Sequence, residues 1–279
     1  MDVVFYGTRG SIPVCDPNFH EFGGDTTCIA LETTDDESPH NRVGIIDAGT
    51  GIFKLGRDLA RSGQGKDLIH IAFTHFHWDH IQGFPFFKPA YDPAQQINIL
   101  ALGAGRGITD LKEIFALQMQ TAYFPVQLDN MGAKFSFILH DKTELKQYYS
   151  AKMSTIRLNH PGGSYGYRME AYGKVVVICT DVEYENGVID ENVVEFARGA
   201  DLLIHDAQYT DEELERFRGW GHSTFNQAME VAERAEVKLL AMTHHDPEHD
   251  DEFLTAVEKN CQDRMQDCFL ARQGMRIRI

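Results

Sequence analysis

The feature that most constrains this chain is residues 75–80, which read His-Phe-His-Trp-Asp-His directly after an apolar run. Imidazole nitrogens and carboxylate oxygens bind divalent transition metals well, and a loop at a strand end can direct alternate side chains into one cavity. His75 and His77, one residue apart, can converge on one ion, whereas the adjacent Asp79 and His80 suit a second ion. A polar surface turn rarely needs three histidines and an aspartate in six positions, so this segment predicts a site for two metal ions.

Composition predicts one domain that spans residues 1–279. A hydrophobic content of 43%, with 18 Phe and 10 Tyr, is ample for a large core, and no tract rich in Pro, Ser or Gly divides the chain. Because no stretch approaches the ~20 apolar residues of a membrane span, we expect a cytoplasmic protein without membrane contact. The five cysteines form no C-x-x-C pair and fit a reducing compartment, where each is expected to be a small buried hydrophobe.

The formal net charge of −16 argues against extended nucleic-acid binding, because polyanion binding relies on clustered Lys and Arg. A small anionic substrate remains compatible with this charge, since bound divalent cations reverse the local field. The charge therefore favours a small substrate over a long polyanion.

Short β-rich runs alternate with amphipathic helical patterns along the chain. The predicted strands are 3–6, 28–32, 43–47, 68–74, 97–102, 134–139, 153–158, 165–172, 174–180, 201–205, 237–242 and 275–279. The predicted helices are 52–61, 109–120, 191–198, 211–217, 224–235 and 251–260, with Ser223 and either Asp250 or Asp251 as N-caps. This order is typical of sheets covered by helices, with the chemistry in loops at strand ends.

Further histidines and aspartates lie at the ends of later predicted strands. A polar residue at one strand end means little, but repetition at several ends predicts a shared rim. The residues concerned are His160, Asp181, His205, Asp206, His244 and His245.

Together these motifs resemble the metallo-β-lactamase fold superfamily, on the phosphodiesterase branch that includes the transfer-RNA 3′-processing endonuclease and the phosphoribosyl 1,2-cyclic phosphate phosphodiesterases. Residues 75–80 match the family's H-x-H-x-D-H motif without departure, and the resemblance covers nearly the whole chain. It implies a four-layer αββα sandwich of the α/β class, with a dinuclear centre between the loop edges of its two sheets.

The resemblance also implies a set of ligands for two divalent ions, expected to be Zn²⁺ or Mn²⁺. His75, His77 and His160 are expected to hold one ion, Asp79, His80 and His244 the other, and Asp181 to bridge them. His245 is an alternative last ligand, although the Thr-His pair that ends a hydrophobic strand favours His244.

A second pair of residues points to phosphodiester chemistry. Asp206 follows a strand, and His222 lies in a Gly-His-Ser-Thr segment, as in the phosphodiesterase branch. A histidine held by a carboxylate can protonate a departing alkoxide. The resemblance implies that two ions lower the pKa of a bridging water to about 7, that the resulting metal-bound hydroxide is oriented by Asp79 and Asp181, and that His222 acts as general acid. Alternatively, His222 only caps the following helix, although Ser223 can do so without it.

We therefore expect a metal-dependent phosphodiesterase for a small phosphodiester, a cyclic nucleotide or cyclic ribose phosphate. The alternatives are an RNA-processing endonuclease, a thioester or lactam hydrolase that needs no Asp206–His222 pair, and a metal-dependent sensor or binding module. A homodimer is compatible with the sequence. The aromatic runs at 84–93 and 123–125 form either a wall that stacks on a base or ribose, or part of the core.

Overall fold

Strand β1 (Asp2–Gly7) shows why this chain builds two stacked sheets: it is apolar on both faces. Val3 and Phe5 pack between the sheets, whereas Val4 and Tyr6 pack under helices on the outer side. Successive side chains of a strand point to opposite faces, so a strand of this composition must be covered on both sides.

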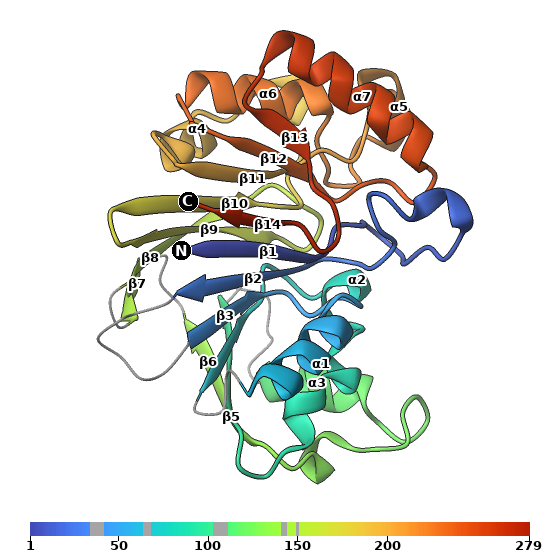
Figure 1. The fold of residues 1–279 in the computed structure, drawn as a ribbon, viewed down its shortest axis with the longest axis vertical. Helices are drawn as coiled ribbons and strands as arrows, with labels where there is room; N and C mark the ends of the chain where they lie inside the picture. The colour runs from blue at the N-terminus through green and yellow to red at the C-terminus, as the bar shows by residue number, and fades with distance from the viewer. Residues whose placement is uncertain (34–41, 64–67, 103–110, 141–143, 149–150) are drawn as a thin grey trace.

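A computed structural model describes residues 1–33, 42–63, 68–102, 111–140, 144–148 and 151–279. In this part of the chain two sheets of seven strands lie face to face (Figure 1). The first has the order β14 (Arg276–Arg278), β1, β2 (Cys28–Thr33), β3 (Arg42–Ile46), β4 (Ile69–Ala72), β5 (Gln96–Leu102), β6 (Lys134–His140). The second has the order β13 (Cys268–Leu270), β12 (Leu240–Thr243), β11 (Leu202–Asp206), β10 (Lys174–Cys179), β9 (Ser164–Ala171), β8 (Ala151–Leu158), β7 (Glu144–Tyr148).

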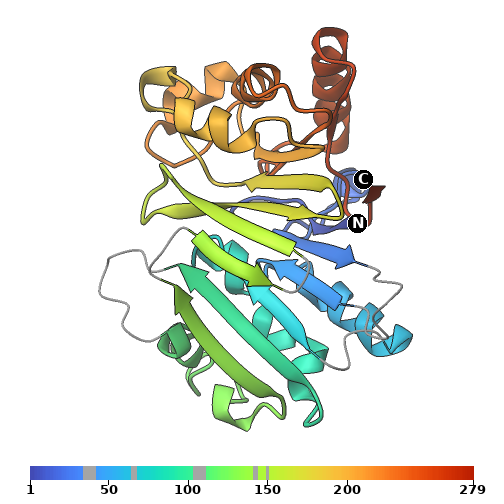
Figure 2. The ribbon, with the colours of Figure 1, turned by 90° about the vertical axis from the view of Figure 1, so that its left-hand side faces the viewer.

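Helices cover the outer face of each sheet, as the two views in Figures 1 and 2 show. The first sheet carries α1 (Ile52–Ser62) and α3 (Leu111–Gln118), and short α2 (Trp78–Ile81) follows β4. The second carries α4 (Glu191–Ala197), α5 (Asp211–Phe217), α6 (Phe225–Arg234) and α7 (Asp251–Arg264). One apolar cluster fills the space between the sheets and one fills each sheet–helix interface. The four-layer αββα sandwich implied by the motifs is confirmed.

The direction of the strands brings the predicted site residues to one edge. β3 to β6 pair in parallel in the first sheet, and β10 to β13 do so in the second. Carboxyl ends of parallel strands meet at the same edge of a sheet, which is where open α/β sheets bind ligands. β4, β10, β11 and β12 therefore deliver the residues that follow them to a common rim.

Most predicted strands and α-helices are present with shifted ends, and three strands or α-helices of the described residues were missed. These are β7, β13 and α2; α2 is four residues long and overlaps the histidine motif. Helix α6 begins one residue later than predicted because Thr224, not Ser223, is its N-cap, in a capping box with Gln227. Asp250 caps α7, whose end lies beyond the predicted residue 260. The predicted start of α3, at 109–110, lies outside the described residues.

Four of the five cysteines are buried as expected, but Cys15 is exposed, so the expectation for that residue was wrong. It lies in a loop before β2 rather than in a strand or helix that faces a core. Among the described residues, no helix combines the length and the apolar character needed to cross a bilayer.

Asp2 joins the first strand to the last, and we predict a pH-dependent role for it. Arg278 donates to Asp2 across 2.9 Å, and this bond has the largest effect on the pKa of Asp2. Burial raises the pKa and Arg276 lowers it, so that the pKa falls from 3.8 to about 2. Asp2→Asn should lower the free energy of unfolding by about 1 kcal/mol at pH 7, allowing for solvent screening of the pair. Because the folded pKa lies below the unfolded value, this difference should be full above pH 4 and vanish as the pH falls through 2.

Urea unfolding of both proteins between pH 7 and 2 measures this difference. Asp263→Asn, which removes the same charge at an exposed position of α7, is the control. A deficit of Asp2→Asn that stays constant down to pH 2 would show that the ion pair is not its source.

Candidate metal centre

A cluster of histidines surrounds one buried carboxylate at the edge of the two sheets. Asp181, which follows β10, directs Oδ1 toward the Nε2 atoms of four histidines. The distances are 3.3 Å to His80, 3.4 Å to His244, 3.8 Å to His75 and 4.0 Å to His160. A carboxylate in this central place lies within reach of both predicted ligand sets.

The two predicted ligand sets come together in space. The ligand atoms of His75, His77 and His160 lie within 4.8 Å of one another, as do those of Asp79, His80 and His244. His160 Nε2 and His77 Nδ1 are 3.0 Å apart, and Asp79 Oδ2 lies 3.2 Å from His244 Nε2. All seven predicted ligands therefore belong to one cluster whose donor set of imidazoles and carboxylates suits zinc or manganese.

The outer nitrogen of four of these rings is held by a neighbour, which fixes the tautomer. His80 Nδ1 lies 2.8 Å from Asp47 Oδ2, His160 Nδ1 2.8 Å from the Gly221 carbonyl, His244 Nδ1 2.9 Å from Gln208 Oε1, and His75 Nδ1 3.1 Å from Thr74 Oγ1. A carboxylate or carbonyl oxygen can only accept, and the Thr74 hydroxyl already donates to Asp47 Oδ2. In the neutral form of each ring the proton is therefore on Nδ1 and the lone pair of Nε2 faces the cluster. This is how histidines that bind metals are usually oriented.

Two buried polar atoms in the cluster have no hydrogen-bond partner among the described residues: His75 Nε2 and Asp181 Oδ2. Buried polar atoms without a partner are costly and rare. A cation between the two sheets would satisfy both atoms, so the donor set fits the metals that the sequence implies.

Electrostatics within the cluster also favour a cation. Burial has the largest effect on the pKa of His75, and the nearby His80 the second largest; both hold it well below its usual value. The ring therefore stays neutral, as a metal ligand must be. Burial opposes ionisation of Asp181, but His244 and His80 outweigh it and hold its pKa well below normal. Burial would lower the pKa of His244, yet Asp181 and Asp79 raise it to about 9. The carboxylates thus create a buried region that attracts positive charge.

The backbone at three strand ends adopts the left-handed conformation that non-glycine residues rarely take. The φ angles are 61° at Asp47, 59° at Asp181 and 66° at His244. Such residues persist only where the surroundings hold them, and they occur often at functional sites. Here the turn ends each strand and directs its side chain into the cluster.

Glycine is required at two positions where the backbone passes close to the imidazole ring of a predicted metal ligand. A Cβ at Gly10 would lie 2.3 Å from His244 Nδ1, and one at Gly221 would lie 2.1 Å from His160 Nδ1. The residue after Gly10 is Ser11, whose backbone N–H donates to Asp79 Oδ2 across 2.8 Å. The N-terminal loop therefore supports the cluster as well as turning the chain.

His222 and Asp206 form a pair beside the cluster. His222 Nδ1 lies 2.8 Å from Asp206 Oδ2, while Asp206 Oδ1 accepts from the Ser223 backbone N–H across 2.8 Å. The His222 ring stacks on His244 with centroids 4.7 Å apart. Thr224 caps α6, so the alternative that His222 serves only as a cap does not describe this geometry.

Two histidines at strand ends lie outside the cluster. His245 points away from it, with Nε2 2.8 Å from the Ala271 carbonyl, and burial lowers its pKa to about 3. His205 Nε2 lies 2.8 Å from the Tyr184 hydroxyl. The structure thus brings His244, rather than His245, to the ligands.

Sequence reasoning missed two supporting residues. The first is Asp47, whose carboxylate orients His80 and also accepts from the Thr74 N–H and hydroxyl. Its position directly after β3 is the signal that singled out Asp181. Gln208, which orients His244, carries no such signal because it lies in a loop two residues after Asp206.

A cavity of about 490 Å³ opens beside the cluster. It is lined by Ser11, Phe76, His77, Trp78, Asp79, Asp181, Trp220 and His222. The aromatic runs at 84–93 and 123–125 do not line it; Phe84 and Phe87 are core residues, while Phe86 and Tyr123 are exposed elsewhere. The substrate-wall interpretation of those runs is therefore not supported by this cavity.

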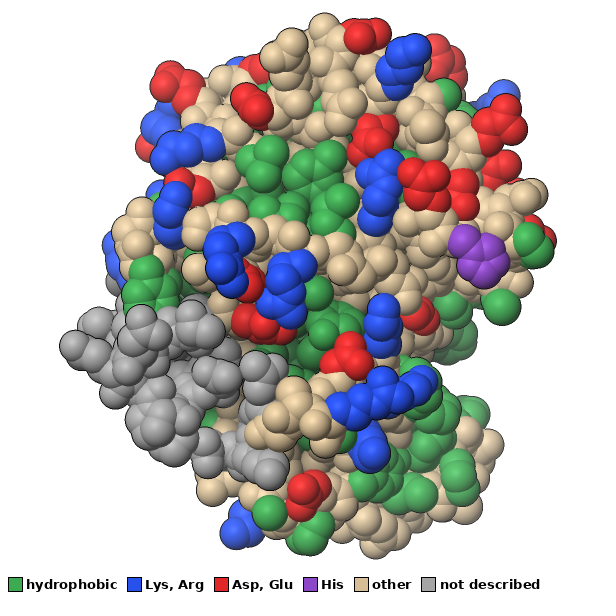
Figure 3. Space-filling view, viewed as in Figure 1, with side chains coloured by type: hydrophobic (Ala, Val, Ile, Leu, Met, Phe, Trp, Pro, Cys, Tyr) green, Lys and Arg blue, Asp and Glu red, His purple; other side chains and the backbone are tan. Residues whose placement is uncertain are grey.

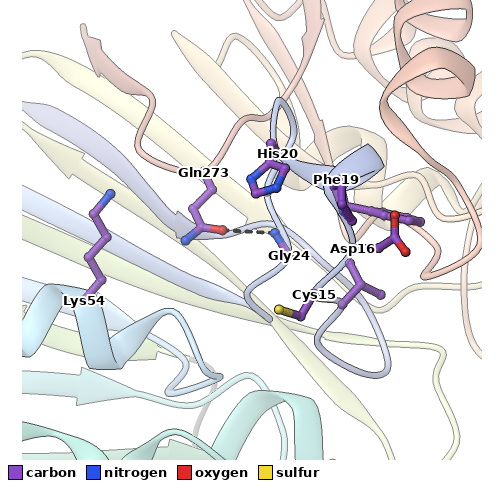
Figure 4. A pocket seen from close by; sticks show the side chains of 10 residues that line it. Cys15, Asp16, Phe19, His20, Gly24, Lys54 and Gln273 are labelled. Atoms are coloured by element: carbon purple, nitrogen blue, oxygen red, sulfur yellow. Dashed lines mark hydrogen bonds between the residues drawn. The ribbon is translucent and has the colours of Figure 1, made fainter.

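A separate hollow of about 480 Å³ lies around the loop that precedes β2 (Figure 4). Exposed Cys15 lines it, and Gln273 crosses it to accept from the Gly24 N–H at 3.1 Å. The Gln273 amide also donates to Asp25 Oδ2 across 2.6 Å. None of the predicted metal ligands lines this hollow.

Comparison with known proteins gives consistent relatives. Residues 42–245 match a family described as "Beta-lactamase superfamily domain". Ribonuclease Z of Haloarcula marismortui is 24% identical over 330 aligned positions, which cover all of this chain and 97% of that protein. Ribonuclease Z of Enterococcus faecalis is 26% identical, with 96% and 93% covered. The crystal structure of the short form of human tRNase Z superposes with a TM-score of 0.68 at 21% identity, covering 100% of this chain and 99% of that one.

The expectation that the acidic charge disfavours extended nucleic-acid binding is wrong, because relatives that align over nearly their full length are ribonucleases. Net charge is a sum over the whole surface, whereas a ligand meets a local field. Figure 3 shows Lys and Arg side chains interspersed with acidic ones over the face seen in Figure 1. A value of −16 therefore does not describe each face.

Asp47→Asn should weaken metal binding by about tenfold, the low end for loss of a group that orients a ligand. Asparagine tolerates the left-handed backbone and keeps the shape, but it removes the charge that fixes the His80 tautomer. Metal retained after dialysis against graded chelator measures the change. Asp25→Asn, which loses the same charge beside Gln273, should retain metal like the wild type. Equal retention by Asp47→Asn would remove Asp47 from the site.

Proposed function

This chain belongs to the β-lactamase superfamily, as its motifs imply, and we propose that it is a metal-dependent phosphodiesterase that cleaves RNA. The family match and the fold support a hydrolase of the metallo-β-lactamase family. The reaction and substrate are the proposal.

The observation that carries the proposal is the Asp206–His222 pair next to the ligand cluster. Hydrolysis of a phosphodiester expels an alkoxide, which is a poor leaving group unless it is protonated. Thioester hydrolysis does not require an acid of this kind, because a thiolate leaves without a proton. A histidine oriented by a buried carboxylate beside the metal ligands therefore supports phosphodiester chemistry.

His75, His77 and His160 would hold one divalent ion, and Asp79, His80 and His244 the other, with Asp181 between them. When bound, two such ions neutralise charge on the phosphate and make water a nucleophile at neutral pH. The Asp79 carboxylate, fixed by the Ser11 N–H, accepts a hydrogen bond from the water and orients it toward phosphorus. Zinc or manganese suits these donors.

Asp206 fixes how His222 handles a proton. Because Asp206 accepts from Nδ1, the nitrogen left for the substrate is Nε2. The protonated ring donates from Nε2 to the departing oxygen as the phosphorus–oxygen bond breaks, and Asp206 stabilises the positive charge before that step. The same ring recovers its proton from solvent after the product leaves.

RNA is the favoured substrate because the ribonuclease Z relatives align with this chain from end to end. The similarity to human tRNase Z covers the whole described architecture. A transfer RNA with a 3′ extension is therefore the first RNA to test.

A small cyclic nucleotide or cyclic ribose phosphate is the second candidate. A cavity of about 490 Å³ lies within the range of small-ligand sites and can take one nucleotide. An acidic chain is also compatible with a small substrate whose charge the ions neutralise.

We predict that the protein loaded with Zn²⁺ or Mn²⁺ contains about two ions per chain, the number that a bridged dinuclear cluster holds. It should cleave a transfer-RNA transcript with a 3′ extension, and chelation should abolish cleavage until metal is restored. Elemental analysis and gel assays on one sample measure both. The panel also holds 2′,3′- and 3′,5′-cyclic nucleotides, bis-p-nitrophenyl phosphate, a thioester and a chromogenic lactam.

The panel separates the candidates. Turnover of cyclic nucleotides without RNA cleavage selects the second candidate. Hydrolysis of the thioester or lactam alone overturns the phosphodiesterase proposal, and bound metal without any turnover points to a sensor or binding module.

His222→Asn should keep the metal content and lower RNA turnover by about 10² to 10⁴-fold, the usual contribution of a general acid. With bis-p-nitrophenyl phosphate the loss should be much smaller, because p-nitrophenolate leaves without a proton. Initial rates on both substrates measure this contrast, and exposed His20→Asn serves as the control. Equal losses on both substrates would remove the acid role from His222.

A further inference from the structure

Both tryptophans of this chain lie at the cavity beside the metal cluster. Trp78 is 82% exposed and Trp220 is 61% exposed. Tryptophan is among the more buried residue types on average, so this placement of both is informative. We propose that the two indole rings stack on the nucleobases next to the scissile phosphate; this deepens the proposed RNA function and rests on it.

Trp78 is held outward by its neighbours. It is the first residue of α2, between His77 and Asp79, and the three residues that follow it in the helix are buried. The ligands occupy the inner side of this short helix, which leaves the indole at the rim. A ring one residue from two ligands lies within reach of whatever the ions bind.

Trp220 lies in a loop that is fixed by hydrogen bonds and by an aromatic contact. Gly219 and Gly221 on either side have φ angles of 85° and 96°, and both their N–H groups donate to the Glu183 carboxylate. Phe217 packs edge-on against the indole with centroids 5.4 Å apart. The loop is also tied to the cluster, because the Gly221 carbonyl holds His160. Phe217 thus packs against the ring, while most of the side chain is exposed and lines the cavity.

The two tryptophans come from different halves of the sandwich, one after β4 and the other between α5 and α6. Neither indole N–H donates a hydrogen bond to another described residue, so each ring is available to a ligand. Every base has a π-face, and stacking on aromatic side chains binds bases with little sequence preference. Neutral rings also explain how a chain of charge −16 can bind RNA without depending mainly on phosphate contacts.

Intrinsic fluorescence tests the inference, since these are the two tryptophans of the chain. The metal-loaded protein is titrated with AMP and, as a base-free match, with ribose 5-phosphate. AMP should quench the emission in a saturable manner, whereas ribose 5-phosphate should not. Trp78→Phe and Trp220→Phe each leave a single tryptophan, so each variant reports on one ring alone, and both should still be quenched.

Kinetics on the RNA substrate give a second readout. Trp78→Leu and Trp220→Leu should each raise KM about tenfold with kcat within twofold, while the phenylalanine variants should restore most of the loss. Truncating exposed rings leaves no cavity in the core, and metal content checks that each variant is folded. Phe53→Leu, at an exposed aromatic residue of α1, is the matched control and should change nothing.

The outcomes separate this inference from the proposed function. Quenching by AMP and not by ribose 5-phosphate, with weaker AMP affinity in the leucine variants, supports base stacking even if RNA is not cleaved. The absence of cleavage then counts only against the proposed function. RNA cleavage with no quenching and unchanged KM overturns the stacking role and leaves the function standing. If the leucine variants change the oligomeric mass but not AMP binding, the rings form a subunit contact and the proposal is wrong.

Discussion

The structure depends on one constraint: ionised carboxylates and imidazoles are buried together between two sheets. Asp79, Asp181 and Asp206 are almost wholly removed from solvent. Burying such charges is costly unless each is paired and hydrogen-bonded. The remaining features of the site meet this demand, including the left-handed strand ends, the two glycines that admit backbone beside the rings, and the neighbours that fix each histidine. A cation at the centre would satisfy the two buried atoms that the protein groups leave without a partner.

Much of the fold and the ligand cluster could be predicted because both have local signals. Residues 75–80 form a dense motif, and Asp181 and His244 each follow an apolar strand, so topology alone brings them to one edge. The choice between His244 and His245 needed the structure, because the left-handed turn at His244 decides which ring faces inward. The cluster agrees with the predicted ligand sets, while their occupancy by metal remains a prediction.

What escaped prediction is explained by contacts between distant parts of the chain. Gln208 supports His244 from a loop with no motif of its own, and the Gly221 carbonyl supports His160 from 61 residues away. Trp78 was visible within the histidine motif, yet nothing in the sequence pairs it with Trp220. Net charge misled for a related reason: it adds the whole surface together, whereas binding depends on the few groups that line one cavity.

Each predicted ion takes ligands from both halves of the sandwich. His80 and His244, whose Nε2 atoms are 3.4 Å apart, are separated by 164 residues of chain. The apolar layer between the sheets holds the two halves together. It therefore sets the effective concentration that ligands from one half present to an ion bound by ligands from the other half. By thermodynamic linkage, packing between the sheets and affinity for metal are two measures of the same coupling. A methyl group such as that of Ala241, which packs in this layer, therefore contributes to metal affinity without touching the ion.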